Sequence, residues 1–227
     1  MRALPTFLRE NNLTLAFGAG FLLTLVGQAL AGCAELNTVL TATGLHPVGC
    51  AEYLLTSDFL VDVTENWQSE FLQFSLYVFA TVWLVQRGSP ESKPLDRIGR
   101  ESDEEQKTGA FAEPDSPAPA SAGGLRQSLY SNSLGIVMAL IFLLSWLAQS
   151  VTGRVTYNEE QLRELQDPVG WTTYVTSAEF WNRTLQNWQS ELLAVASTVV
   201  LSVYLRQRGS PESKPVGAAH TSTGVEG

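Results

Sequence analysis

The sequence predicts an all-α membrane protein with four transmembrane helices, arranged as two parallel helical-hairpin repeats. Two uncharged apolar runs, Leu13 to Ala31 and Leu134 to Val151, contain 19 and 18 residues. At about 1.5 Å per residue, each is about long enough to cross a hydrocarbon core of about 30 Å. The sequence also repeats at a fixed offset of 121 residues, and each copy carries a second, shorter apolar stretch. The repeat doubles one two-helix unit.

Composition and charge exclude several classes of partner. The 227 residues include 14 Lys and Arg against 23 Asp and Glu, which gives a net charge of −9. No basic stripe is available to displace counterions from phosphates, so we expect no nucleic-acid partner. A polybasic patch for anionic lipid headgroups is also missing. The bunched apolar residues make the lipid bilayer itself the expected partner.

The repeat is the strongest signal in the chain. It assigns a first membrane repeat to residues 5–94 and a second to residues 126–215. The clearest matches are Asn66-Trp67-Gln68-Ser69-Glu70 with Asn187-Trp188-Gln189-Ser190-Glu191, and the segment 86–94 with 207–215. Further matches in the same register are Asn11, Phe21, Gln28, Gly32, Tyr53 and Phe59 with Asn132, Phe142, Gln149, Gly153, Tyr174 and Phe180. A gapless register of this length indicates an internal duplication.

Residues 95–125 are predicted to form a disordered cytoplasmic tether. They carry an acidic run and then Pro114, Pro117 and Pro119 among Ala, Ser and Gly. This composition has too little apolar surface to offset the entropy of ordering. Residues 216–227 are predicted to form a flexible tail.

Each second apolar stretch, Phe71 to Val85 and Leu192 to Leu205, is too short to cross a bilayer by itself. No Gly or Pro interrupts residues 58–87, so one continuous helix of about 30 residues is expected there. Ser57 or Asp58 is the expected N-cap, with Ser177 or Glu179 in the second copy. The helix is expected to end at Gly88 in a left-handed conformation, followed by Pro90.

The distribution of Lys and Arg predicts the direction of the four crossings. Eleven of these residues lie in the termini and the tether, and three, Arg154, Arg163 and Arg183, lie in the two remaining loops. Because cytoplasmic loops carry the excess of Lys and Arg, both termini and the tether are expected in the cytoplasm. The predicted location is the bacterial cytoplasmic (inner) membrane, as a multi-pass protein.

The two cysteines, Cys33 and Cys50, both fall in the first external loop. In an oxidising compartment they can form a disulfide, and no metal site is expected because no His lies with them. The segment Leu30 to Cys33 also has the form of a lipoprotein cleavage site, with Cys33 as the acylated residue. Lipidation and the disulfide remain alternatives at this point.

The motif at 66–70 and 187–191 has two interpretations. We favour an interfacial belt, in which Trp67 and Trp188 anchor the helices at the headgroup level and Glu70 is solvated. The alternative places Glu70 and Glu191 inside the membrane as paired carboxylates that share a proton or a cation, as in a small transporter or channel.

The repeated segment at the inner ends of the second and fourth helices is a candidate cytosolic docking surface. A helix stop needs a Gly, a Pro and a cation, yet nine consecutive residues are identical in the two copies. The candidate docking residues are Arg87, Gly88, Pro90, Glu91 and Lys93 in the first copy, with Arg208, Gly209, Pro211, Glu212 and Lys214 in the second.

Signatures of known chemistry are missing from the sequence. The two histidines, His46 and His220, do not assemble a zinc helix or a nucleophile with its base, and the sequence has no phosphate-binding or dinucleotide motif. We therefore expect no catalytic residue and no cofactor. The sequence favours a non-enzymatic protein with a structural or partner-binding role in the bacterial envelope, the partner being another protein or a second copy.

The motifs together resemble a bacterial integral-membrane family recorded as a domain of unknown function. The similar features are Gly27 to Gly32, Tyr157 to Gln161, the motif at 66–70 and the segment from Gln86 to Lys93. The chain departs from the family pattern at Cys33, at Leu192 in place of Phe, and in the first copy, which lacks the Tyr-Asn-Glu-Glu-Gln sequence. The resemblance implies a bacterial membrane location, with this chain as a tandem version, and it implies no activity.

Overall fold

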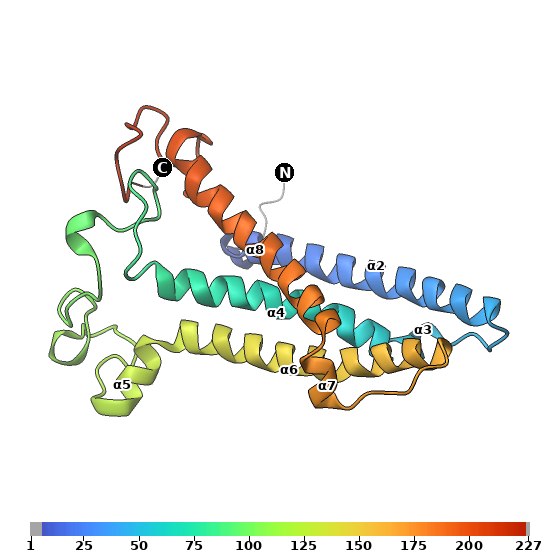
Figure 1. The fold of residues 1–227 in the computed structure, drawn as a ribbon. Coiled ribbons are helices and arrows are strands. Elements are labelled where there is room, and N and C mark those ends of the chain that lie inside the picture. Colours follow the sequence, from blue (N-terminus) through green and yellow to red (C-terminus); the bar gives the residue numbers. More distant parts are fainter. Residues whose placement is uncertain (1–5, 226–227) are drawn as a thin grey trace. The chain divides into compact units, whose positions relative to one another are not determined.

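The computed structural model describes residues 6–225, which form helices and loops without any β-strand (Figure 1). The all-α fold class is therefore confirmed for the described part of the chain. The α-helices are α1 (Thr6–Glu10), α2 (Asn12–Ala42), α3 (Cys50–Tyr53), α4 (Ser57–Ala80), α5 (Gly124–Ser131), α6 (Ser133–Arg163), α7 (Trp171–Val175) and α8 (Ala178–Tyr204). Two 3-10 turns, η1 (Leu95–Arg97) and η2 (Gly109–Phe111), lie between α4 and α5.

Equivalent helices begin at equivalent positions in the two sequence copies. Helices α2 and α6 each contain 31 residues. The starts of α2, α3 and α4, at residues 12, 50 and 57, lie 121 positions before those of α6, α7 and α8, at residues 133, 171 and 178. The ends of α2 and α6 also match, since Gly44 and Leu165 both have a positive φ, of 77° and 60°. Leucine tolerates this conformation less well than glycine, so the second copy holds it at some cost.

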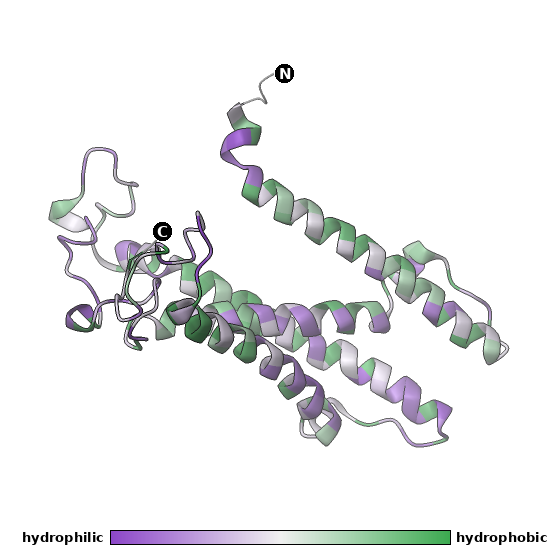
Figure 2. Cartoon of the chain, turned by 90° about the horizontal axis from the view of Figure 1, so that it is seen from above, coloured by the Kyte–Doolittle hydropathy of each residue, from purple (hydrophilic) through white to green (hydrophobic). Residues whose placement is uncertain are grey.

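Two helices of the described chain, α2 and α6, are long and apolar enough to cross a bilayer, whereas the sequence predicted four crossings. The apolar character of α2 and the mixed character of α4 and α8 can be followed in Figure 2. Helices α4 and α8 are less apolar because their first halves carry the polar motif and acidic residues such as Asp62 and Glu65.

Helix α4 is shorter than predicted, because it ends at Ala80 rather than at Arg87. The chain tightens there: the backbone N–H of Trp83 bonds to the carbonyl of Ala80, and the freed carbonyl of Val82 accepts from the N–H of Gly99 at 2.9 Å. Gly88 has the predicted positive φ, 89°, but it lies in a turn beyond the helix rather than at its end.

The start of α4 also differs from the prediction, whereas the start of α8 agrees with it. The hydroxyl of Thr56, rather than Ser57 or Asp58, accepts from the N–H of Phe59 at 3.4 Å. In α8 the N-cap is Ser177, whose side chain accepts from the N–H of Phe180. Both caps occupy the position before the first helical residue, where a hydroxyl satisfies an otherwise unpaired donor.

The chain divides into two compact units, which do not coincide with the two sequence copies. The first unit ends at Val63 and includes Thr152–Pro168, and the second comprises Thr64–Val151 and the chain from Val169 onward. Within the first unit the core consists of Cys33, Tyr53 and Phe59, with Leu25, Ala29, Leu36, Val48 and Val63 packed around it.

Within the second unit, helices α4, α6 and α8 pack in alternating directions. Phe79 and Glu65 of α4 lie against Gly135 and Gln149 of α6, so the two helices run antiparallel. Arg183 of α8 contacts Glu65 of α4, and Trp188, further along α8, contacts Gln68, further along α4. Helices α4 and α8 therefore run parallel. In two hairpin repeats of the same orientation, the second and fourth helices must run parallel to each other and the third must run antiparallel to both.

The segment predicted to be disordered, residues 95–125, contains η1, η2, connecting turns and the first two residues of α5 in the structure. Lys93 pairs with the carboxylate of Glu101 and donates to the carbonyl of Gly99 at 2.8 Å. The hydrogen bond from Lys93 is the main cause that lowers the pKa of Glu101. These local contacts fold the first part of the segment back toward the end of α4.

Candidate functional site

The second unit buries a set of polar side chains between α4, α6 and α8, which we call the polar cluster. Its members are Glu65, Gln68, Trp146, Gln149, Arg183, Thr184 and Trp188. Gln68, Gln149 and Thr184 are fully buried, at 0% exposure. Burying amides and hydroxyls is costly unless they are hydrogen-bonded, so these contacts define the interior of the unit.

An ion pair anchors one end of the polar cluster. The guanidinium of Arg183 binds Glu65 through both of its oxygens, with Nε to Oε1 at 2.5 Å and Nη2 to Oε2 at 3.0 Å. Gln149 Nε2 also donates to Glu65 Oε1, at 3.2 Å. The charge of the buried carboxylate is thus compensated by a two-pronged partner, the geometry that makes such pairs strong.

Aromatic rings surround the other end of the polar cluster. The indole N–H of Trp188 donates to Gln68 Oε1 at 2.7 Å. Trp146 lies 5.7 Å from Trp188 and stacks on Phe180 at 6.2 Å, measured between ring centroids. Large rings of this kind exclude water from the surface of a helix bundle and add favourable ring contacts.

Four polar atoms of the polar cluster have no hydrogen-bond partner. They are Gln68 Nε2, Trp146 Nε1, Gln149 Oε1 and Thr184 Oγ1. Gln68 and Gln149 therefore each use one end of their amide, on Trp188 and Glu65, and leave the other end unpaired. Four such atoms in one small region exceed what a well-packed interior normally leaves unsatisfied.

The two copies of the predicted motif contribute differently to the polar cluster. In the first copy, Gln68 and Ser69 are buried while Asn66, Trp67 and Glu70 are exposed. In the second copy, Trp188 provides the contact, Asn187 is half-buried, and Gln189 and Ser190 are exposed. The proposed carboxylate pair is not part of the polar cluster, since Glu70 is exposed and Glu191 is half-buried.

Sequence reasoning missed the other members of the polar cluster. Glu65 lies just outside the predicted motif at 66–70, and Arg183 entered the prediction only as a cation of a loop. The register between the copies did hold one signal, because Gln28 and Gln149 are matched polar residues within apolar runs. A polar residue kept in both copies of a membrane helix is a functional candidate.

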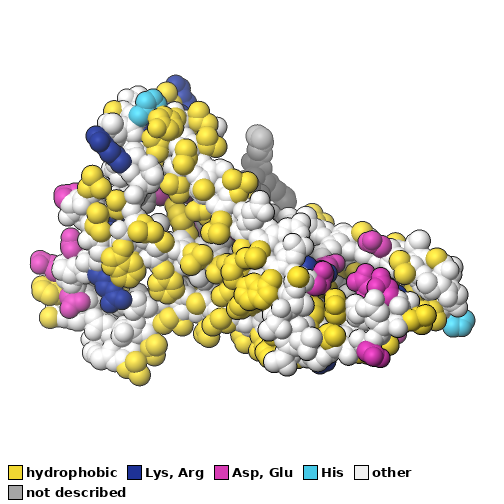
Figure 3. All heavy atoms as spheres, viewed as in Figure 1, with side chains coloured by type: hydrophobic (Ala, Val, Ile, Leu, Met, Phe, Trp, Pro, Cys, Tyr) yellow, Lys and Arg dark blue, Asp and Glu magenta, His cyan; other side chains and the backbone are white. Residues whose placement is uncertain are grey.

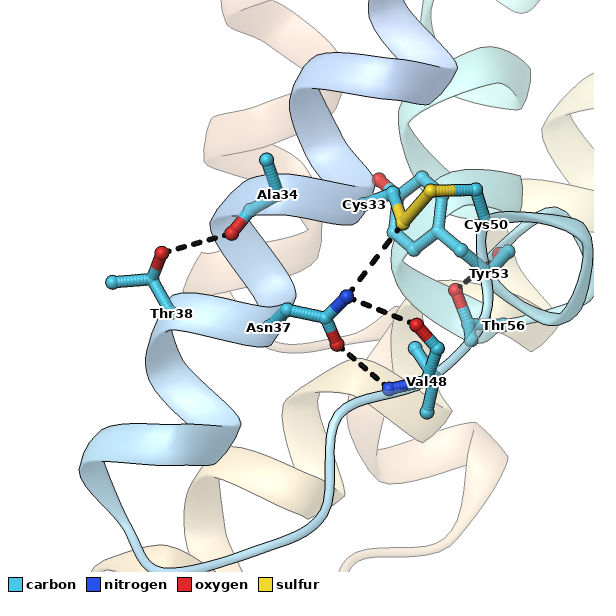
Figure 4. The surroundings of a disulfide bond; sticks show 8 residues. All are labelled: Cys33, Ala34, Asn37, Thr38, Val48, Cys50, Tyr53 and Thr56. Atoms are coloured by element: carbon cyan, nitrogen blue, oxygen red, sulfur yellow. Dashed lines mark hydrogen bonds between the residues drawn. A yellow bond between two sulfur atoms is a disulfide. The ribbon is translucent and has the colours of Figure 1, made fainter.

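In the first unit, Cys33 and Cys50 form a disulfide with a Cα–Cα distance of 5.4 Å (Figure 4). The amide of Asn37 reinforces this link, because it donates to the carbonyl of Val48 at 2.9 Å and accepts from the N–H of Val48 at 2.7 Å. Two hydrogen bonds and a covalent bond thus fix the loop between α2 and α3. A disulfide at Cys33 leaves no thiol there for acylation.

Tyr53 packs against α2 next to the disulfide. Its ring meets Phe59 edge-on at 5.5 Å, and Tyr174 meets Phe180 in the same way and at the same distance in the second copy. Tyr53 fits because Gly32 has no side chain: a Cβ there would lie 2.7 Å from Tyr53 Cζ. Burial of the side chain is the main cause that raises the pKa of Tyr53. The negative charges of Asp62, Asp58 and Glu35 raise it further.

The two candidate docking segments form the same turn. The N–H of Gln86 donates to Ser92 Oγ and the N–H of Gln207 donates to Ser213 Oγ, both at 2.9 Å. Of the candidate docking residues, Arg87, Glu91, Arg208, Gly209, Pro211 and Glu212 are exposed, Lys93 is half-buried, and Gly88, Pro90 and Lys214 are buried. The repeated sequence therefore encodes a folded turn as well as a charged surface.

The tail predicted to be flexible comprises residues 216–227, of which 226 and 227 lie outside the described residues. Residues 216–225 pack against the first of these turns. Lys214, 1% exposed, donates to the carbonyls of Gly88 at 2.6 Å and His220 at 2.9 Å. The N–H of Gly88 donates to Thr223 Oγ1, also at 2.9 Å, and that of Gly224 donates to the carbonyl of Ser89. Burial of the ammonium is the main cause that lowers the pKa of Lys214, and the positive charge of Arg206 lowers it further.

Over residues 6–225, these features define an all-helical protein with two helices that are able, by length and composition, to cross a membrane. The chain belongs to the family defined by a domain of unknown function, DUF6766, which matches residues 4–225. The match includes both sequence copies and the segment between them. No curated protein and no solved structure matches the chain significantly.

Proposed function

We propose that the protein is a non-enzymatic, multi-pass protein of the bacterial cytoplasmic membrane that crosses the bilayer four times, as two parallel hairpin repeats. The observation that carries the proposal is the open apolar surface of α2, where none of the bilayer-length apolar window is buried. Phe17 and Leu23 are 75% and 74% exposed, and hydrophobic side chains also cover much of the face seen in Figure 3. An apolar surface of this extent needs a lipid or protein partner.

The packing of the second unit supports membrane crossing by α4 and α8 as well. Polar residues that lower the hydropathy of these helices are buried inside the unit, namely Glu65, Gln68 and Ser69 of α4 and Thr184 of α8. Polar residues of membrane helices face the bundle interior rather than the lipid. The average composition of α4 therefore understates how apolar its outer surface is.

The predicted topology places the cysteines outside and the repeated turns inside. An oxidising exterior favours the Cys33–Cys50 disulfide, in agreement with the direction given by the Lys and Arg residues. The matching starts of α2 to α4 and α6 to α8 support a duplication. The charged, exposed parts of the two turns then form one cytoplasmic surface for a protein partner or a second copy.

Reporter fusions in bacterial cells distinguish four crossings from two. With four crossings, a reporter at Pro114 is cytoplasmic and one at Asp167 is external. If only α2 and α6 cross, and the N-terminus is cytoplasmic, the two positions exchange sides. Fusions that place Pro114 outside and Asp167 inside would therefore refute the four-crossing topology.

The partner-binding role is tested separately by chemical cross-linking in intact membranes. Replacement of Arg87, Glu91, Arg208 and Glu212 by Ala removes exposed charges. It leaves the Gln86–Ser92 and Gln207–Ser213 hydrogen bonds of the turns in place and removes the one that Tyr77 donates to Glu91. We expect the cross-linked product of the wild-type protein, with itself or with another protein, to disappear. Lys107→Ala, in the segment between the copies, is the control, and an unchanged product in the fourfold variant refutes docking at the turns.

A further inference from the structure

We propose that the polar cluster between α4, α6 and α8 is a binding site for ordered water, which joins the three helices. The proposal starts from the four unpaired atoms, Gln68 Nε2, Trp146 Nε1, Gln149 Oε1 and Thr184 Oγ1. Gln68, Gln149 and Thr184 are fully buried, so bulk solvent does not satisfy these groups. An unsatisfied polar group in a protein interior is expensive, and one or two water molecules remove the cost.

The four atoms lie on neighbouring surfaces of the three helices. Trp146 and Gln149 are three residues apart on α6 and share one face. Gln149 contacts Glu65, which lies one turn from Gln68 on α4. Thr184 follows Arg183, the partner of Glu65, and lies one turn before Trp188, the partner of Gln68. Each helix thus contributes at least one unpaired atom to the same region.

The chemistry of these atoms selects a neutral ligand with both donors and acceptors. The two N–H groups, of Gln68 and Trp146, need an acceptor, and the carbonyl oxygen of Gln149 needs a donor. The hydroxyl of Thr184 can serve as either. Water meets all of these requirements, and a buried water typically makes two to four such bonds.

An ion fits the polar cluster less well than water. Arg183 already neutralises Glu65 with two hydrogen bonds, so no uncompensated charge is left to attract a cation. The described residues also contain no group of three or more His, Cys, Asp or Glu that could hold a metal ion. An anion would lie beside the carboxylate of Glu65, and the unpaired N–H donors of the cluster, those of Gln68 and Trp146, are neutral.

Thr184→Val distinguishes a hydrated cluster from a dry one, because the two cases predict opposite changes in the unfolding midpoint. Valine has the shape of threonine without the hydroxyl. In a hydrated cluster the variant loses a hydrogen bond to water, and we expect the unfolding midpoint in detergent to fall by about 2–4 °C. In a dry cluster it removes an unpaired hydroxyl, so the midpoint stays or rises. Thr198→Val is the control, since Thr198 is exposed on α8 and bonds only to its own helix.

Water-edited solid-state NMR on the full-length protein in lipid tests for water directly. We expect magnetisation to pass from water to the side-chain amide of Gln68 at a rate similar to that of the exposed Gln189, and expect Thr184→Val to reduce that transfer at Gln68 only. Absence of transfer to Gln68 in the wild-type protein overturns the proposal, whatever the melting experiment gives. A Thr184→Val variant at least as stable as the wild type overturns it as well.

Discussion

Gly32→Ala tests the packing of Tyr53 against α2, and Gly27→Ala in the same helix is its matched control. A Cβ at position 32 would lie 2.7 Å from Tyr53 Cζ and 3.1 Å from Cε1, with the hydroxyl oxygen closer still, whereas a Cβ at position 27 meets no atom within 4 Å. The Tyr53 ring is 3% exposed and held against Phe59, so it cannot turn away freely.

The difference between the two variants follows from this geometry. Both gain about 1 kcal/mol from replacing Gly by Ala inside a helix. Gly32→Ala alone adds the cost of overpacking, about 1–3 kcal/mol. For a chain of this length that difference corresponds to about 2–12 °C in the unfolding midpoint.

Thermal unfolding in detergent, followed by circular dichroism with the disulfide intact, measures the effect. Adding Tyr53→Phe to Gly32→Ala removes the closest atom, the hydroxyl oxygen, and should restore part of the lost stability. A Gly32→Ala protein that melts at or above the temperature of Gly27→Ala would show that the described contact does not exist.

Three further experiments test other properties of the structure. Since the pKa of Tyr53 is raised above its ordinary value of 10.0, the unfolded state loses this proton first, so stability is full below pH 10 and falls as the pH rises further. Tyr53→Phe should remove that part of the alkaline loss in a pH-dependent unfolding series. Gly88→Ala and Gly209→Ala both force a residue with a positive φ into a strained conformation, at about 1–2 kcal/mol. Only Gly88→Ala also collides with the backbone of the C-terminal segment, so proteolysis of that segment should accelerate in Gly88→Ala and stay unchanged in Gly209→Ala. Arg183→Met leaves a buried carboxylate without its partner and should cost about 1–3 kcal/mol in chemical denaturation, whereas Glu179→Gln, at an exposed pair 4.0 Å long, should change stability by less than about 0.5 kcal/mol.

Much of the helical architecture follows from the sequence, because apolar runs and an internal repeat are patterns that extend over many residues. The two runs predicted α2 and α6, although both helices continue about eleven residues past the apolar part. The end of α4 was not predictable from the absence of Gly and Pro. It depends on the hydrogen bond from Gly99 to Val82, which requires the fold of a segment with little sequence signal.

The candidate site was harder to predict for a physical reason. A motif present in both copies suggests a symmetric arrangement of Glu70 and Glu191, yet the structure joins Gln68 of one copy to Trp188 of the other. The two most polar contacts of the cluster, from Arg183 and Gln149 to Glu65, have no repeated counterpart in the motif. Which residues of a repeat face each other depends on how the helices are rotated when they pack, and periodicity alone does not fix this rotation.

The enclosure of the Lys214 ammonium by backbone carbonyls affects how this end of the molecule can be recognised. A synthetic peptide that copies the repeated nine residues would expose the lysine and serine side chains that the folded chain hides. Antibodies or binders raised against such peptides should therefore recognise denatured protein better than native protein.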